Sequence, residues 1–203
     1  MIEYYKEIKS PSISKYKEKK SKFTAYIFSV YNETDIKEKL KLIRKKESSA
    51  KHYCYAYIIN SDKSRQISND DGEPSSSAGK PILSQIIANN LTNTLIVVAR
   101  HYGGIKLGIP GLIRSYKTAA ANVIMNASIN IIKISEDYKI IFNYLEMNNV
   151  MRIIKKYNLE ITTTKFNNDY ELIIRLPLDI LKLVKKKLKE NHKITMKKII
   201  LND

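Results

Sequence analysis

The residues of this chain best suited to chemistry lie between positions 70 and 117. Residues 70–81 read Asp-Asp-Gly-Glu-Pro-Ser-Ser-Ser-Ala-Gly-Lys-Pro, which places three carboxylates in a loop that proline and glycine keep from being helical. Residues 100–108 read Arg-His-Tyr-Gly-Gly-Ile-Lys-Leu-Gly and lead into a helical pattern. Glycines let backbone N–H groups approach a ligand, and a helix start offers unpaired donors. The segment therefore predicts a site for an anion, or for a metal ion that holds one.

The cations of this segment are candidate contacts for phosphate or carboxylate. A guanidinium binds either group through two parallel hydrogen bonds, and Arg114 and Lys117 lie three apart on one helix face. The glycine spacing matches neither a dinucleotide fingerprint nor a P-loop, so the alternative is a turn whose glycines serve backbone geometry alone. The predicted anion or RNA contacts are Lys80, Arg100, His101, Gly103, Gly104, Lys106, Arg114 and Lys117.

The acids of this cleft, Asp70, Asp71 and Glu73, have two interpretations. Either they hold Mg²⁺ or act as a general base, since hard cations prefer carboxylates, or they are solvated or paired with a nearby arginine. His52, Cys54 and His101 would make a poor zinc site, and a lone cysteine is more often an inert buried group. We therefore predict cleft acids but no catalytic residue, no metal and no cofactor.

Composition restricts the class of protein. The chain has 203 residues, 43% of them hydrophobic, which suits one domain or two small ones. No apolar run approaches the roughly 20 residues of a membrane span, and the N-terminus lacks the apolar stretch of a signal peptide. A single cysteine excludes an internal disulfide. We expect a cytoplasmic protein with no membrane partner.

The net charge of +16 favours a nucleic-acid partner, without DNA sequence specificity. The alternative is compositional drift towards lysine. Lysines 185–187, with Lys182 and Lys189, lie on a predicted helix and form either a solvated face or a contact for phosphate backbone. Tyrosines 53, 55 and 57 share one face of a predicted strand and either stack bases or belong to the core.

The elements that position these residues fall into two domains, 1–132 and 133–203. In the second domain, residues 136–201 follow a β-α-β-β-α-β order, which is the ferredoxin-like unit. The fold class is therefore α+β. In the first domain we predict strands at 22–30, 52–60 and 94–101, a helix after residue 32, a loop at 61–79, a helix at 81–90, a turn at 102–109 and a helix from 110 to about 127.

Three motifs resemble the IMPACT/YigZ family. They are Asp-Asp-Gly-Glu-Pro-Ser-x-x-Ala-Gly-Lys-Pro, Arg-x-Tyr-Gly-Gly-x-x-Leu-Gly and Gly-Leu-x-Arg-x-Tyr. The resemblance implies a first domain similar to the second domain of a small-subunit ribosomal protein, and a ferredoxin-like second domain similar to a C-terminal domain of elongation factor G. One departure is Gly108-Ile109-Pro110-Gly111, where the family usually has Gly-Thr-Gly-Gly. The loss of the threonine hydroxyl and the loss of one glycine N–H each remove a group that could contact a ligand.

The resemblance implies a role in translation, because eukaryotic relatives act in translational control. The leading hypothesis is a regulator that binds RNA, the ribosome or a translation-associated protein. One alternative is an enzyme for a phosphorylated or nucleotide-like substrate, with Asp71 or Glu73 as base and Lys106 and Arg114 as clamps. The other is a protein-interaction module, which predicts an exposed apolar patch.

Overall fold

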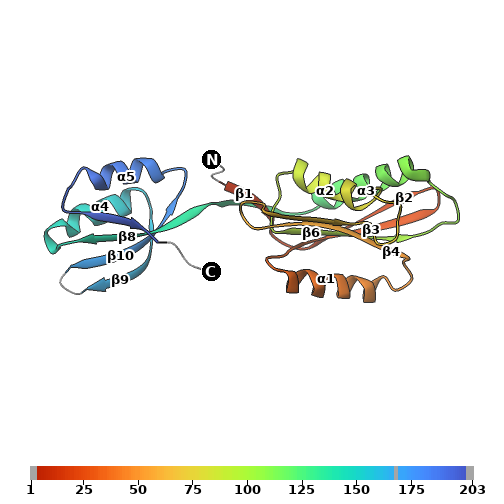
Figure 1. Ribbon diagram of the computed structural model, residues 1–203, viewed down its shortest axis with the longest axis horizontal. Helices are drawn as coiled ribbons and strands as arrows, with labels where there is room; N and C mark the ends of the chain where they lie inside the picture. Colours follow the sequence, from red (N-terminus) through yellow and green to blue (C-terminus); the bar gives the residue numbers. More distant parts are fainter. Residues whose placement is uncertain (1–3, 167–168, 200–203) are drawn as a thin grey trace. The chain divides into compact units, whose positions relative to one another are not determined.

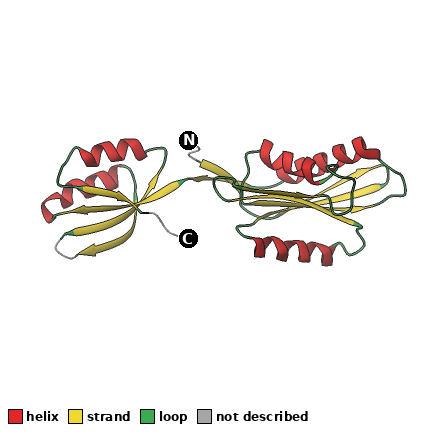
Figure 2. Cartoon of the chain, viewed as in Figure 1, coloured by secondary structure: helices red, strands yellow, loops and turns green. Residues whose placement is uncertain are grey.

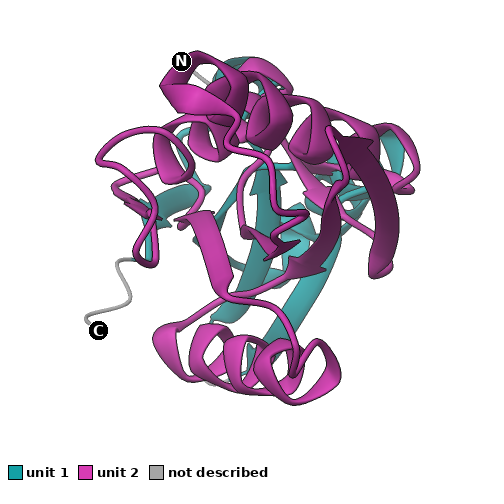
Figure 3. Ribbon diagram, turned by 90° about the vertical axis from the view of Figure 1, so that its right-hand side faces the viewer, with its two compact units in different colours: residues 1–4, 133–203 teal, residues 5–132 magenta. Residues whose placement is uncertain are grey.

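The computed structural model describes residues 4–166 and 169–199. The chain divides into two compact units (Figure 3). The larger unit spans Tyr5–Ile132, and the smaller one begins at Lys133 and also takes in Tyr4. Each unit has its own buried apolar core, so each is described by itself.

Five antiparallel strands form the sheet of the larger unit, in the order β2-β3-β6-β4-β5. Helix α1 covers one face of this sheet, and helices α2 and α3 cover the other (Figure 1). Strands β1 and β7 form a separate two-stranded sheet. The bounds are β1 Tyr4–Ile8, β2 Ser12–Glu18, β3 Ser21–Ser29, α1 Glu33–Lys46, β4 His52–Ile59, β5 Arg65–Asn69, α2 Gly79–Ala88, β6 Thr94–His101, α3 Gly108–Met125 and β7 Ile129–Lys133.

The side chains of β4 alternate between two cores, as the period of a strand requires. Cys54 and Ile58 lie in the core beneath α2 and α3. Tyr53 and Tyr57 are buried in the core beneath α1, with Tyr55 packed against it. These tyrosines therefore belong to the core, which was the alternative to base stacking.

Four strands of the larger unit, β1, β2, β5 and β7, were not predicted from the sequence. β2 and β5 are the outer strands of the sheet, and β5 lies inside the segment predicted to be a loop. All of β5 except Ser68 is exposed, so this edge strand shows no apolar alternation that the sequence could reveal.

The smaller unit follows the predicted β-α-β-β-α-β order. Its sheet has the strand order β11-β8-β10-β9, and α4 and α5 pack on one face of it (Figure 1, Figure 2). The prediction of a mixed α+β protein is confirmed, whereas the similarity to ribosomal and elongation-factor domains stays a prediction. Residues 200 and 201, at the end of the last predicted strand, lie outside the described residues. The bounds are β8 Ser135–Phe142, a short 3₁₀ turn Tyr144–Glu146, α4 Met147–Lys156, β9 Glu160–Phe166, β10 Tyr170–Pro177, α5 Leu181–Lys189 and β11 Thr195–Lys198.

Candidate functional site

Asp70 fixes the start of helix α2. Its Oδ1 accepts from the backbone N–H groups of Ala78 and Gly79 at 2.9 and 2.8 Å, and its Oδ2 accepts from Ser76 at 2.8 Å. Burial disfavours the charged carboxylate, but these donors outweigh it and hold the pKa of Asp70 below its usual value. The Asp70 carboxylate thus caps the N-terminus of α2, although Asp70 is not the residue at the N-cap position.

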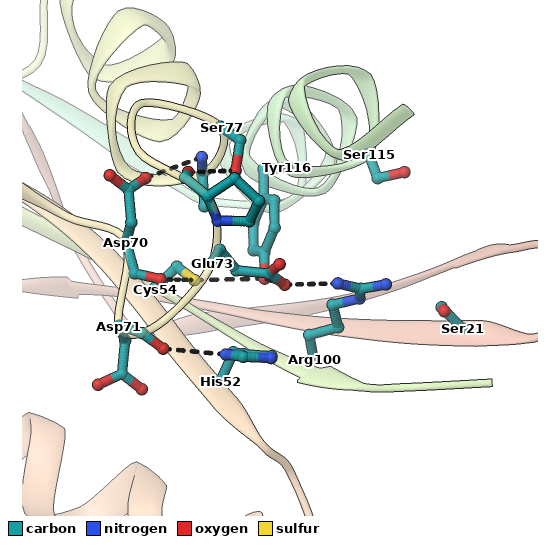
Figure 4. A network of polar contacts seen from close by, with 12 residues as sticks. Ser21, His52, Cys54, Asp70, Asp71, Glu73, Ser77, Arg100, Ser115 and Tyr116 are labelled. Atoms are coloured by element: carbon teal, nitrogen blue, oxygen red, sulfur yellow. Dashed lines mark hydrogen bonds and ion pairs between the residues drawn. The ribbon is translucent and has the colours of Figure 1, made fainter. Parts of the chain in front are cut away.

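Asp71 ties the same loop to helix α1 and strand β4. Its carboxylate pairs with Arg44 at 2.8 Å and accepts from the backbone N–H of Tyr53 at 2.7 Å. Its carbonyl accepts from Nδ1 of His52 at 2.9 Å (Figure 4). Both carboxylate oxygens already have donors, so Asp71 is placed as a structural residue.

Glu73 lies at the centre of a buried polar network (Figure 4). Its Oε1 pairs with Nη1 of Arg100 at 2.6 Å and accepts from the hydroxyl of Tyr116 at 2.8 Å. The Cys54 thiol donates to the carbonyl of Asp70 at 3.0 Å and contacts the Tyr116 hydroxyl at 3.2 Å. Burial raises the pKa of both Cys54 and Tyr116, so both stay protonated at neutral pH.

The three acids Asp70, Asp71 and Glu73 are all bound by groups of the protein itself. Each of the three binds protein donors, and Glu73 takes the arginine pairing that was one of its two predicted roles. Among the described residues, no group of three or more His, Cys, Asp or Glu side chains is arranged to hold a metal ion.

A pocket of about 430 Å³ opens above this network, at the N-terminus of α3. Arg100 and Glu73 belong to its lining, and Lys51, His52 and Lys106 contribute polar groups. Its other lining residues are Pro74, Tyr102, Leu107, Gly108, Ile109 and Leu112. The pocket is therefore mainly apolar, with cations around it. Of the predicted site residues, it brings together only Glu73, Arg100 and Lys106.

The remaining predicted contacts lie outside the pocket lining. His101 belongs to the α1 face, where Nε2 meets Glu47 at 2.8 Å and Nδ1 meets the Ser49 hydroxyl at 3.3 Å. Burial opposes ionisation of Glu47, but its bonds to Tyr26 and His101 lower its pKa. Lys80 on α2, and Arg114 and Lys117 on α3, are exposed.

The two glycines of the predicted cradle differ. Gly103 N–H donates to the Ser21 hydroxyl at 3.2 Å, and a Cβ at Gly103 would lie 2.1 Å from the carbonyl carbon of Lys20. Gly103 is thus needed for close packing against the β2–β3 turn, which is the backbone role considered as the alternative. Gly104 has a φ of +83° and nothing within 4 Å of its Cβ position, so it is needed for a left-handed turn.

Comparison with known proteins identifies the family. The model of the Impact N-terminal domain matches residues 19–124. The chain belongs to the IMPACT family. An IMPACT family member of Haemophilus influenzae is 30% identical over 158 residues, which are 77% of each chain. The IMPACT family member YvyE of Bacillus subtilis is 43% identical over 97 residues, so this chain spans about half of that relative, 45% of its length.

A solved structure supports the fold. The crystal structure of a hypothetical protein superimposes with a TM-score of 0.69 over 100% of both chains, at 22% sequence identity. At that identity the similarity concerns the fold alone. The IMPACT motifs quoted above supply Asp70, Glu73, Arg100 and Tyr116, which are four members of the buried network. The family signature in this chain therefore builds the floor and wall of the pocket.

A second candidate surface lies in the smaller unit, beyond the segment that the IMPACT model matches. Helices α4 and α5 border a groove of about 430 Å³, and a second depression of about 550 Å³ adjoins it along α4. Arg152 and Lys156 line both, Lys155 lines the second and Lys187 lines the first. The sequence indicated the lysines of α5 but not those of α4. The spacing Arg152-x-x-Lys155-Lys156 could have predicted this surface, because it places all three cations on the outer side of an amphipathic helix.

None of the helices within residues 4–166 and 169–199 combines the length and the apolar character that a membrane-spanning segment needs.

Proposed function

We propose that this protein is a regulator of translation that binds RNA or the ribosome through the groove between α4 and α5. The observation that carries the proposal is a concentration of cations, three of which have no counterion among the described residues. Within residues 4–166 and 169–199, no ion pair joins Arg152, Lys155 or Lys156 to a carboxylate. Only Lys187 is paired in this groove, with Glu190 at 3.0 Å.

Unpaired cations favour an anionic polymer because phosphates replace the missing counterions. Neutralising phosphates releases the ions condensed on the nucleic acid, which makes binding favourable and dependent on salt. The role in translation comes from membership of the IMPACT family.

The opposite face of the same unit is less suited to RNA. The open sheet face carries Lys139 paired with Glu171 at 3.0 Å, and Arg175 paired with Asp137 at 3.2 Å. These pairs neutralise four charges of this face, while Lys165 and Lys197 on the same face are in no ion pair among the described residues. Binding of single-stranded RNA to an open sheet relies on exposed aromatic side chains. The helical face is therefore the better candidate.

Co-sedimentation with ribosomes across a salt series tests the proposal. We expect wild-type protein to be retained at low salt and lost steeply as salt rises. The variant Arg152→Glu/Lys156→Glu should bind far less, and the slope of log K against log[salt] should fall by about 1.4–1.8, since each phosphate contact contributes about 0.7–0.9.

Lys41→Glu/Lys45→Glu is the matched control. These lysines lie four residues apart on the exposed side of α1, as Arg152 and Lys156 do on α4, and the net charge changes equally. Equal losses in the two variants would mean that overall charge, not this groove, governs binding. No retention of the wild type at any salt concentration would refute the proposed function.

A further inference from the structure

The pocket in the larger unit combines an apolar interior with a neutralised polar floor. The side chains of Arg100 and Glu73 are 6% and 4% exposed and pair at 2.6 Å, so the two charges at the floor cancel. Among the described residues, Nε of Arg100 is buried without a hydrogen-bond partner. Tyr102, Leu107 and Leu112 contribute apolar wall. The volume of about 430 Å³ suits a bulky side chain or a small ligand.

The rim of the pocket exposes more apolar surface than a solvated loop requires. Tyr102 and Ile109 line the pocket and are 44% and 53% exposed. Ile105 lies in the loop between them, and Ile113 lies one helical turn after Ile109 on α3, and both are exposed. Such a cluster around a concave site is the usual mark of a protein-binding surface.

The charge at the rim selects the partner. Lys51 and Lys106 line the pocket, and neither is paired with an acid within residues 4–166 and 169–199. An acidic partner would supply the missing counterions. Apart from Tyr102, the exposed rim residues Ile105, Ile109 and Ile113 are aliphatic, which favours an apolar side chain over a base held between stacking rings.

We propose that this pocket binds an acidic segment of a partner protein, which inserts one bulky apolar side chain between Tyr102 and Ile109 while its carboxylates meet Lys51 and Lys106. This surface is separate from the α4–α5 groove and does not depend on RNA binding. It makes the protein a two-site adaptor, with one site for a protein and one for nucleic acid.

Labelled synthetic peptides test the proposal by fluorescence anisotropy. The probes are short Glu/Ser/Gly peptides with one central Phe, Leu or Ile, compared with the same peptides carrying Ala at the centre or Lys in place of Glu. We expect at least one anchored acidic peptide to bind about tenfold or more tighter than its Ala counterpart, as a buried anchor residue implies. Exchange of Glu for Lys should abolish binding.

Two variants with the same substitution locate the binding. Ile109→Asp should abolish peptide binding, and Asp is tolerated there because an acid in the first turn of a helix is favourable. Ile87→Asp, on α2 outside the pocket, is the control, since Ile87 is 52% exposed. Both variants should co-sediment with ribosomes as the wild type does, so this test and that of the proposed function can fail separately.

Three results would overturn the proposal. The first is peptide binding that does not depend on the central residue, and the second is an equal effect of Ile109→Asp and Ile87→Asp. The third is a different occupant: either a single-stranded oligonucleotide or a second copy of this chain binds the wild type and is lost only in Ile109→Asp.

Discussion

Two arginine–carboxylate ion pairs each have their acid in the loop at residues 70–81, and they differ mainly in burial. Comparing them tests how much the buried network around Glu73 contributes to the free energy of unfolding. Arg100 pairs with Glu73 at 2.6 Å, with side chains 6% and 4% exposed. Arg44 pairs with Asp71 at 2.8 Å, with side chains 50% and 24% exposed. Arg→Met removes the charge in each case and keeps a long apolar side chain.

The expected losses follow from what each substitution leaves behind. Arg100→Met leaves the Glu73 carboxylate buried with only the Tyr116 hydroxyl as a strong donor, and an orphaned buried charge costs about 3–5 kcal/mol. Arg44→Met removes an exposed pair worth about 0–1 kcal/mol. It also removes a contact of the guanidinium with the Tyr53 ring at 4.6 Å, which contributes about 0.5–1 kcal/mol. Arg100→Met should therefore lose about 1–4.5 kcal/mol more than Arg44→Met.

Urea unfolding followed by far-UV circular dichroism measures both losses. The reaction of the Cys54 thiol with a disulfide reagent assigns them to the larger unit, because Cys54 is buried in that core. Arg100→Met/Glu73→Gln should recover most of the loss, since the neutral amide no longer needs a cation. Equal losses for Arg100→Met and Arg44→Met, or no recovery in the double variant, would refute the reasoning.

Two further predictions concern the backbone of the site. Gly103→Ala should destabilise the protein by more than about 2 kcal/mol, because its Cβ would displace the backbone of Lys20. Gly104→Ala should cost only about 1–2 kcal/mol, which is the cost of placing an alanine in the left-handed region. Thermal unfolding of both variants measures the difference. Asp70→Ala should lose about 1–2 kcal/mol at neutral pH, as for a lost helix cap. Since the folded pKa of Asp70 is lowered, its stabilisation is complete above its unfolded value of about 4 and is lost as the pH falls through the folded value. Unfolding curves of wild type and Asp70→Ala should therefore converge in acid, and a gap that stays constant with pH would contradict this role.

The sequence indicated three lining residues of the candidate pocket, but not which residues would lie beside them. Residue type and glycine spacing pointed to Glu73, Arg100 and Lys106, which do line one pocket. Lys51 was missed because it lies far from the motifs in sequence. Only the pairing of β4 with β6 brings it close, and the Lys51 N–H donates to the Arg100 carbonyl at 3.1 Å. Such a contact depends on sheet register, which no local pattern fixes.

The strand period separates two of the predicted contacts. Arg100 and His101 were both predicted as anion or RNA contacts, yet they are adjacent in a strand. Successive side chains of a strand point to opposite faces of the sheet. Arg100 accordingly meets Glu73 on the α2–α3 side, while His101 meets Glu47 beside α1.

The IMPACT family model covers one of the two candidate surfaces and not the other. The IMPACT match at residues 19–124 contains every lining residue of the pocket, whereas the cations of the α4–α5 groove lie between residues 152 and 187. A function that needs only the matched domain would therefore depend on the larger unit, which contains the pocket. The proposed binding of RNA through the α4–α5 groove would need the smaller unit. If the α4–α5 groove binds RNA as proposed, the apolar rim of the pocket stays available for a protein partner, because the two surfaces share no lining residue.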